Sequence, residues 1–183
     1  MYRPVPAAAV TIVREVRRRA RWRVRHRLGP GDAGSLTALH GVLYASEYGY
    51  DRTFEAYVAA GLAEFVRRFR PDRDRLWLAE AGGRVVGSIA IVGRARKSAQ
   101  LRWFLVDPAH RGRGLGTRLM RAALRFCRDR GYRRVLLWTT SELEEASRLY
   151  VRFGFVRTAV KTHTVWGKRV TEERYDLDLR GGA

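Results

Sequence analysis

A glycine-rich segment in the second half of the chain has the composition of a phosphate-binding loop. It reads His110-Arg111-Gly112-Arg113-Gly114-Leu115-Gly116-Thr117 and follows Asp107-Pro108. Three glycines within five residues carry a high conformational entropy cost, which is offset where the backbone must approach a ligand closely. Between a strand and the first turn of a helix, their amides and the positive end of the helix dipole favour a phosphate group. The segment therefore predicts a loop that binds the pyrophosphate of a cofactor.

Two common nucleotide-binding motifs do not fit this loop. A Walker loop ends in Gly-Lys-Ser or Gly-Lys-Thr, and a dinucleotide fingerprint needs Gly-x-Gly-x-x-Gly. After Gly112-Arg113-Gly114, the position of the third glycine is taken by Thr117. A glycine-rich connection without a ligand stays open as the alternative.

The elements around the loop follow from hydrophobic periodicity. Leu115 to Arg130 has its apolar side chains at helical spacing, and Gly131 stands where a left-handed C-terminal cap is expected. Before the loop, Gln100 to Val106 has the composition of a strand. The order strand, helix, strand predicts a crossover that places the loop at the end of the first strand.

The rest of the chain is expected to complete a mixed α/β sheet. Helices are predicted around Leu36 to Tyr44, with Asp32 or Ser35 as cap, from Asp51 to Pro71, and from a Ser141/Glu144 capping box to Phe153. The other predicted strands are Arg21 to Leu28, Leu76 to Ala81, Val85 to Val92, Val135 to Trp138, Phe155 to Val165 and Val170 to Leu179. A basic segment, Val10 to Ala20, predicts a short helix.

Composition limits the class of protein. The chain of 183 residues contains no apolar run long enough to span a membrane and no apolar core of a signal peptide, so we expect a cytoplasmic protein of one domain. Cys127 is the single cysteine, which excludes an internal disulfide and a Cys/His metal cluster. The formal charge of +19 would attract polyanions such as nucleic acid. Since only Lys97, Lys161 and Lys168 are lysines among 37 basic residues, biased codon usage is an equal explanation.

Two motifs resemble those of the GNAT superfamily of N-acetyltransferases. Arg111-x-x-Gly114-x-Gly116 is similar to the family's Arg/Gln-x-x-Gly-x-Gly/Ala signature, and Leu149-Tyr150-Val151-Arg152-Phe153-Gly154-Phe155 is similar to its closing motif. His40-Gly41-x-Leu43-Tyr44 and Leu137-Trp138-Thr139 further resemble acetyltransferase domains fused behind MarR-type winged helices. The resemblance implies a single α/β (α+β) domain over residues 21–183, with about six to seven strands and four helices, preceded by a basic extension at 1–20.

The same resemblance implies a reaction and a set of site residues. Acetyl-CoA would donate an acetyl group to a primary amine by direct attack, without a metal. The expected cofactor residues are those of the strand end and the loop: Leu105, Val106, Arg111, Gly112, Arg113, Gly114, Leu115, Gly116 and Thr117. Tyr150 matches the tyrosine that protonates the leaving sulfur. Backbone amides near Leu105 and Val106 would stabilise the oxyanion.

The base and the acceptor are less specified by sequence. Many relatives carry a glutamate on the strand that here contains Gln100, Arg102 and Trp103. Glu47, expected in the loop after the first helix, is our candidate for the base or for a contact to the substrate ammonium. Tyr48 and His40 are weaker candidates for substrate contacts, and His40 equally fits a buried helix histidine with its hydrogen bond satisfied.

Two questions stay open at this level. The acceptor amine is unidentified, because acceptor pockets are built from loops, here represented by Gly41 to Phe54 and the terminal hairpin. A homodimer is compatible with the apolar tail. The alternative function is a nucleic-acid-binding or regulatory protein on an acetyltransferase-like scaffold.

Overall fold

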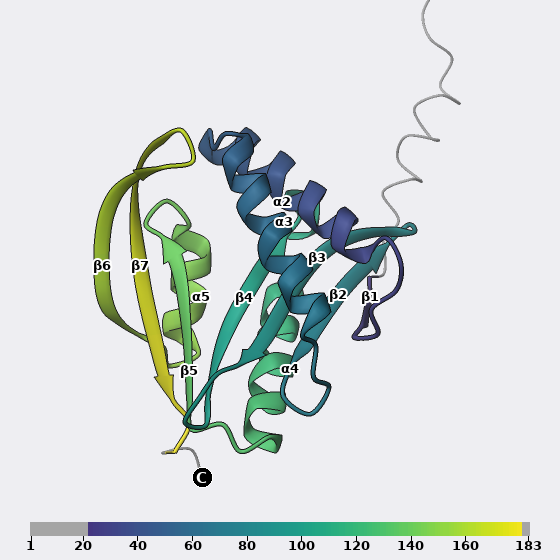
Figure 1. Ribbon diagram of the computed structural model, residues 1–183, viewed down its shortest axis with the longest axis vertical. Helices are drawn as coiled ribbons and strands as arrows, with labels where there is room; N and C mark the ends of the chain where they lie inside the picture. Colours follow the sequence, from purple (N-terminus) through teal and green to yellow (C-terminus); the bar gives the residue numbers. More distant parts are fainter. Residues whose placement is uncertain (1–21, 181–183) are drawn as a thin grey trace, which may run out of the picture.

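In the computed structural model, residues 22–180 are described and form a seven-stranded mixed sheet with helices on both faces (Figure 1). The strand order is β1-β2-β3-β4-β5-β7-β6. The strands are β1 (Arg23–Arg25), β2 (Arg75–Ala81), β3 (Arg84–Gly93), β4 (Ser98–Val106), β5 (Arg134–Thr140), β6 (Val156–Val165) and β7 (Lys168–Asp178). The helices are α2 (Asp32–Tyr48), α3 (Arg52–Arg67), the 3-10 turn η1 (Pro108–His110), α4 (Leu115–Asp129) and α5 (Glu144–Arg152). The predicted fold class is confirmed, whereas the extension at 1–20 and its helix lie outside the described residues.

Two hydrophobic cores lie on opposite faces of the sheet. Helices α2 and α3 bury one cluster, which includes Leu36, Val58 and Leu62, against β2 and β3. Helix α4 buries the other, in which Leu119 and Met120 are fully enclosed, and α5 extends the same layer. Because both faces are covered, the central strands are apolar on both sides, which explains their continuous apolar composition.

Strands β4 and β5 separate along their length, and this separation positions the site. They pair in parallel only where Ser98 to Gln100 meets Arg134 to Leu136, and beyond that point they diverge (Figure 1). A bulge in β4 contributes, because Trp103 and Phe104 of β4 together oppose the single residue Ile89 of β3 there. Trp103, at the bulge, has a φ of 46°, a left-handed backbone that costs a bulky residue of order 1–3 kcal/mol. The Ser88 hydroxyl stabilises the bulge by donating to the Trp103 carbonyl at 2.5 Å.

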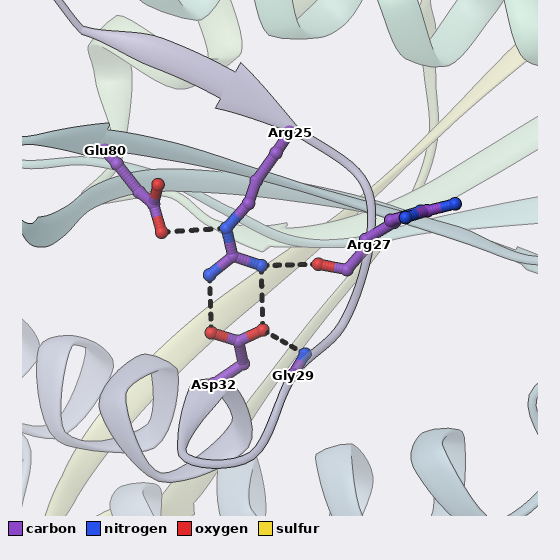
Figure 2. Close-up of polar contacts among 5 residues, drawn as sticks. All are labelled: Arg25, Arg27, Gly29, Asp32 and Glu80. Atoms are coloured by element: carbon purple, nitrogen blue, oxygen red, sulfur yellow. Dashed lines mark hydrogen bonds and ion pairs between the residues drawn. The ribbon is translucent and has the colours of Figure 1, made fainter.

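The first strand ends at Arg25, earlier than the predicted strand Arg21 to Leu28. After Arg25, backbone amide and carbonyl groups that would pair a longer strand with its neighbour instead form hydrogen bonds to side chains (Figure 2). The Arg25 guanidinium donates to the Arg27 carbonyl and to both carboxylate oxygens of Asp32, and its Nε donates to Glu80 on β2 at 2.7 Å. The Gly29 amide donates to Asp32 at 2.6 Å. This cluster ties β1 to the start of α2 and ends the strand.

Two predicted helix caps were wrong. Gly31, with a φ of 87°, precedes α2 without a side-chain cap, because the Asp32 carboxylate is held by Arg25 and Gly29. Leu143 precedes α5, also without a side-chain cap, and the Ser141 amide donates to the Thr171 carbonyl of β7. Tertiary partners therefore replaced the local capping interactions. The predicted cap after α4 is confirmed in conformation, since Gly131 has a φ of 67°.

Within the described part of the chain, no helix combines the length and apolar character required to cross a membrane.

Candidate active site

A cavity of about 770 Å³ lies beside the glycine loop, between the end of β4 and helix α5. Its walls come from α2, the last residues of β4, the loop with the first turn of α4, and the start and outer face of α5. Eight of the nine predicted cofactor residues line it: Leu105, Val106, Arg111, Gly112, Gly114, Leu115, Gly116 and Thr117. Arg113, the ninth, is exposed and does not line the cavity. The structure thus brings nearly the whole predicted set to one surface.

The loop backbone leaves donors free to face a ligand. Gly112 and Gly114 have φ values of 70° and 81°, which side chains rarely adopt, and a Cβ built on either would meet no atom within 4 Å. Gly114 is the N-cap of α4 and no side chain caps this end. Within the helix, the first amide that bonds back to Gly114 is that of Arg118. The preceding amides, from Leu115 to Thr117, therefore lack helical acceptors and can bind an anion.

Arg111 links the loop to β4 and α2. Its Nε donates to the Val106 carbonyl at 2.9 Å, and its Nη2 forms a salt bridge to Glu47 at 2.8 Å. Glu47 was predicted in a loop, but it lies in the last turn of α2, which continues to Tyr48 and ends at Gly49. No glycine or proline interrupts residues 45–48, and the left-handed Gly49 ends the helix, which explains its greater length. Both Glu47 and Tyr48 line the larger cavity.

A smaller cavity of about 110 Å³ opens on the other side of the gap between β4 and β5. Its walls come from α2, α3, β4, β5 and the β6–β7 hairpin. Tyr44, Phe104 and Leu143 line both cavities. The two cavities therefore adjoin where the strands diverge, so two molecules entering from opposite sides can meet there.

Tyr150 lies at this junction as a buried side chain. Only 4% of it is exposed, and its ring packs near Phe104, Phe155 and Tyr175. It lines the smaller cavity. Burial raises the pKa of the Tyr150 phenol above its ordinary value, and the adjacent Thr139 side chain lowers it by less. The phenol therefore keeps its proton through the neutral range.

His40 lines the smaller cavity from α2. Its side chain is buried, and Nδ1 lies 2.9 Å from the Leu36 carbonyl one turn earlier. Burial lowers the pKa of His40 to about 4, so the imidazole is neutral at pH 7. This is the buried helix histidine that the sequence allowed.

The two predicted oxyanion donors, the backbone amides of Leu105 and Val106, point in opposite directions. The Asp107 amide donates to Val86 on β3 at 2.9 Å. Because amides alternate in direction along a strand, the Val106 amide faces the gap and the Leu105 amide faces β3. Val106 is therefore the better placed donor of the two.

Several lining residues were not found from the sequence. Arg148 and Arg152 of α5 line the larger cavity, and Arg102, Trp138 and Glu172 line the smaller one. Arg152 and Trp138 belong to motifs quoted from the sequence, but those motifs assigned them no site role, because the lining residues come together only through the sheet register and the divergence of β4 and β5. The terminal hairpin was expected to contribute to the acceptor pocket, and its residues Trp166 and Glu172 line the smaller cavity.

Across residues 22–180, no three His, Cys, Asp or Glu side chains converge in a metal-binding group. Cys127 is buried away from both cavities, and burial raises the pKa of its thiol to about 12.

Comparison with known proteins agrees with this geometry. Curated relatives include N-acetyltransferase 8F1 of Rattus norvegicus, 32% identical over 64% of this chain and 57% of that protein, and N-acetyltransferase 8 of Mus musculus, 40% identical over 45% and 38%. The chain spans about half the length of the curated relatives it matches.

Solved structures share the fold. A GNAT-family acetyltransferase of Staphylococcus aureus superposes with a TM-score of 0.72 at 16% identity, over 87% of this chain and all of that one. The yncA protein of Salmonella typhimurium, solved with its cofactor acetyl-CoA, gives 0.67 at 22% identity, over 89% and 96%. The model of the acetyltransferase (GNAT) family matches residues 42–155, which is more than half of the sequence. The chain therefore belongs to the acetyltransferase (GNAT) family.

Proposed function

We propose that this protein is an N-acetyltransferase that transfers the acetyl group of acetyl-CoA to a primary amine. The observation that carries the proposal is the junction of the two cavities at Phe104, with the glycine loop on one side. The amine nitrogen attacks the thioester carbonyl carbon, the carbon–sulfur bond breaks, and the products are an N-acetyl amide and CoA. A direct attack of this kind needs both substrates bound together at adjoining sites.

The larger cavity is the proposed acetyl-CoA site. The free amides from Leu115 to Thr117 would bind the pyrophosphate, supported by the dipole of α4. Phe104, Leu105 and Val106 form the open edge of β4 along which the pantetheine arm would lie. The thioester oxygen would accept a hydrogen bond from the Val106 amide as negative charge develops on it.

Tyr150 is the proposed acid for the leaving thiolate. It is adjacent to the junction, and its raised pKa keeps the proton available for transfer to sulfur. The phenol oxygen is then reprotonated before the next turnover.

Glu47 stays our candidate for the base or for an ammonium contact. Its salt bridge to Arg111 adds a second role, because the same contact fixes the arginine of the loop against α2. Tyr48 and His40 are proposed as acceptor-side contacts, with His40 acting as a neutral imidazole. Tyr48 lies beside Glu47 in the larger cavity, whereas His40 lies in the smaller one.

The experiment is an amine screen that detects the free thiol of released CoA. The buried Cys127, with its raised pKa, contributes little background to a thiol reagent. Mass spectrometry of the product locates the acetyl group on nitrogen. Tyr150→Phe is the matched variant, because it removes one hydroxyl and keeps the ring packing. Acetyl-CoA consumption without any acetylated amine, or equal activity in the variant, would contradict the proposal.

A second role on the same scaffold is favoured by one surface feature. The exposed face of α4 carries Arg118, Arg121, Arg125 and Arg128 at helical spacing, and none forms a salt bridge with a residue in 22–180. Such a stripe could bind the phosphates of a nucleic acid. Binding of DNA or RNA that weakens steeply with salt would support it, and salt-independent or absent binding would exclude it.

The narrower resemblance to MarR-fused acetyltransferase domains, a cytoplasmic location and a homodimer stay predictions.

A further inference from the structure

The smaller cavity contains an arginine without an acidic partner. Arg102, on β4, is half-buried, and its guanidinium lies 4.4 Å from the ring of Trp103 and 5.9 Å from that of Tyr57. Its polar contact is a long one, 3.4 Å, to the Tyr57 hydroxyl, and no carboxylate in residues 22–180 pairs with it. The other N–H groups of this guanidinium have no acceptor among the described residues and can donate to an anionic ligand. The cavity therefore offers a site for an anion.

A carboxylate with one open oxygen lies on another wall of the same cavity. Glu172, on β7, has a side chain only 14% exposed. Its Oε2 lies 2.8 Å from Lys161 Nζ and 2.6 Å from His163 Nε2. Its Oε1 has no partner among the described residues, so this atom is available to an ammonium group.

Aromatic side chains surround these two charges. Trp166 and Phe104 line the cavity together with Tyr57 and Trp138, two residues that are 52% and 37% exposed. Large exposed aromatic residues beside a cavity indicate an apolar ligand surface. The cavity thus combines an arginine without a carboxylate partner in residues 22–180, a carboxylate with one open oxygen and an apolar rim.

We propose that this cavity is the acceptor site and that it selects an amine carrying a carboxylate on an apolar or aromatic stem, as an aromatic α-amino acid does. Arg102 binds the carboxylate, Glu172 Oε1 attracts the ammonium, and the stem packs on Tyr57 and Trp138. The inference rests on the proposed function, because it identifies the substrate class of the same reaction. The formal charge of +19 also favours an acceptor that carries a negative charge.

The test uses three compounds that share one ring. L-Phenylalanine has both charged groups, 2-phenylethylamine lacks the carboxylate, and 3-phenylpropionate lacks the amine. Binding to the CoA-loaded protein is followed by intrinsic fluorescence, because Trp103, Trp138 and Trp166 line the cavity. The variant is Arg102→Met, and the matched control is Arg84→Met, an exposed arginine at the start of β3 that lines neither cavity.

We expect phenylalanine to exceed phenylethylamine in kcat/KM by about 10- to 100-fold, the range of one charge-assisted hydrogen bond. Arg102→Met should remove this preference, because it should weaken the binding of L-phenylalanine and 3-phenylpropionate but not that of 2-phenylethylamine. Arg84→Met should leave the preference intact. Glu172→Gln should weaken both amines and not phenylpropionate. Two results would overturn the inference without contradicting the proposed acetyltransferase activity. One is an equal kcat/KM for the two amines, and the other is an equal loss of kcat/KM for both amines in Arg102→Met.

Failure of the proposed function has a different signature. If acetyl-CoA does not bind and no amine is acetylated, the enzymatic proposal fails whatever the fluorescence shows. Arg102-dependent binding of phenylalanine would then still support an amino-acid site in this cavity. If phenylalanine binding is absent or independent of Arg102, the amino-acid site is overturned as well.

Discussion

Replacing Gly114 with alanine separates the loop's structural role from its binding role. Gly114 has a φ of 81°, and an added Cβ would meet no protein atom within 4 Å. The fold therefore bears only the cost of a left-handed residue, about 1–2 kcal/mol. For a chain of this size that cost corresponds to a melting temperature lower by about 2–8 °C. The new methyl group would project into the space that the proposed pyrophosphate occupies.

Gly82→Ala is the matched control. Gly82, in the β2–β3 turn, has a φ of 56° and equally open surroundings, and it lines neither cavity. We expect both variants to lose similar stability in thermal unfolding. Only Gly114→Ala should weaken acetyl-CoA binding, by about 10- to 100-fold in calorimetry, because charge-assisted bonds from the loop amides are displaced. Wild-type affinity in Gly114→Ala, or equal losses in the two variants, would refute the assignment of the loop.

Three further results are expected. Tyr150→Phe should lower kcat by about 10²- to 10⁴-fold with unchanged acetyl-CoA affinity. Because burial raises the pKa of the Tyr150 phenol, the wild-type protein should not lose activity between pH 7 and 9 through deprotonation of this residue. In the folded protein the pKa of His40 is about 4, below its ordinary 6.5, so its contribution to the free energy of unfolding is full above pH 6.5 and falls by about 3 kcal/mol as the pH drops to 4. In denaturant titrations, His40→Gln should make the free energy of unfolding depend less on pH over this range. Asp32→Asn should cost about 1–3 kcal/mol in unfolding free energy by breaking the Arg25 cluster, whereas Asp178→Asn, at an exposed pair, should leave the melting temperature unchanged.

Local patterns predicted the elements that depend on local physics. Helix α4 and its loop were found because glycine spacing and a helical period are both readable within a few residues. The hairpin of β2 and β3 was equally evident from the glycine pair at its turn. These features need no information about distant parts of the chain.

Features that depend on tertiary partners were missed. The Asp32 carboxylate does not cap α2 because Arg25, on a separate strand, binds it more strongly than the helix amides can. Arg102 and Glu172 are 70 positions apart and share a cavity only because β4 and β5 diverge. The bulge at Trp103, which contributes to that divergence, has no signal in the sequence, since tryptophan rarely adopts a positive φ.

The most direct test of the central claim is a calorimetric titration of the purified protein with acetyl-CoA, alongside Gly114→Glu, which introduces a carboxylate and bulk into the loop. The loop geometry predicts saturable binding of one acetyl-CoA per chain, weaker at higher salt because phosphate charge is recognised, and its loss in the variant. No binding by the wild-type protein, or unchanged binding in Gly114→Glu, would contradict the claim that this loop holds the cofactor.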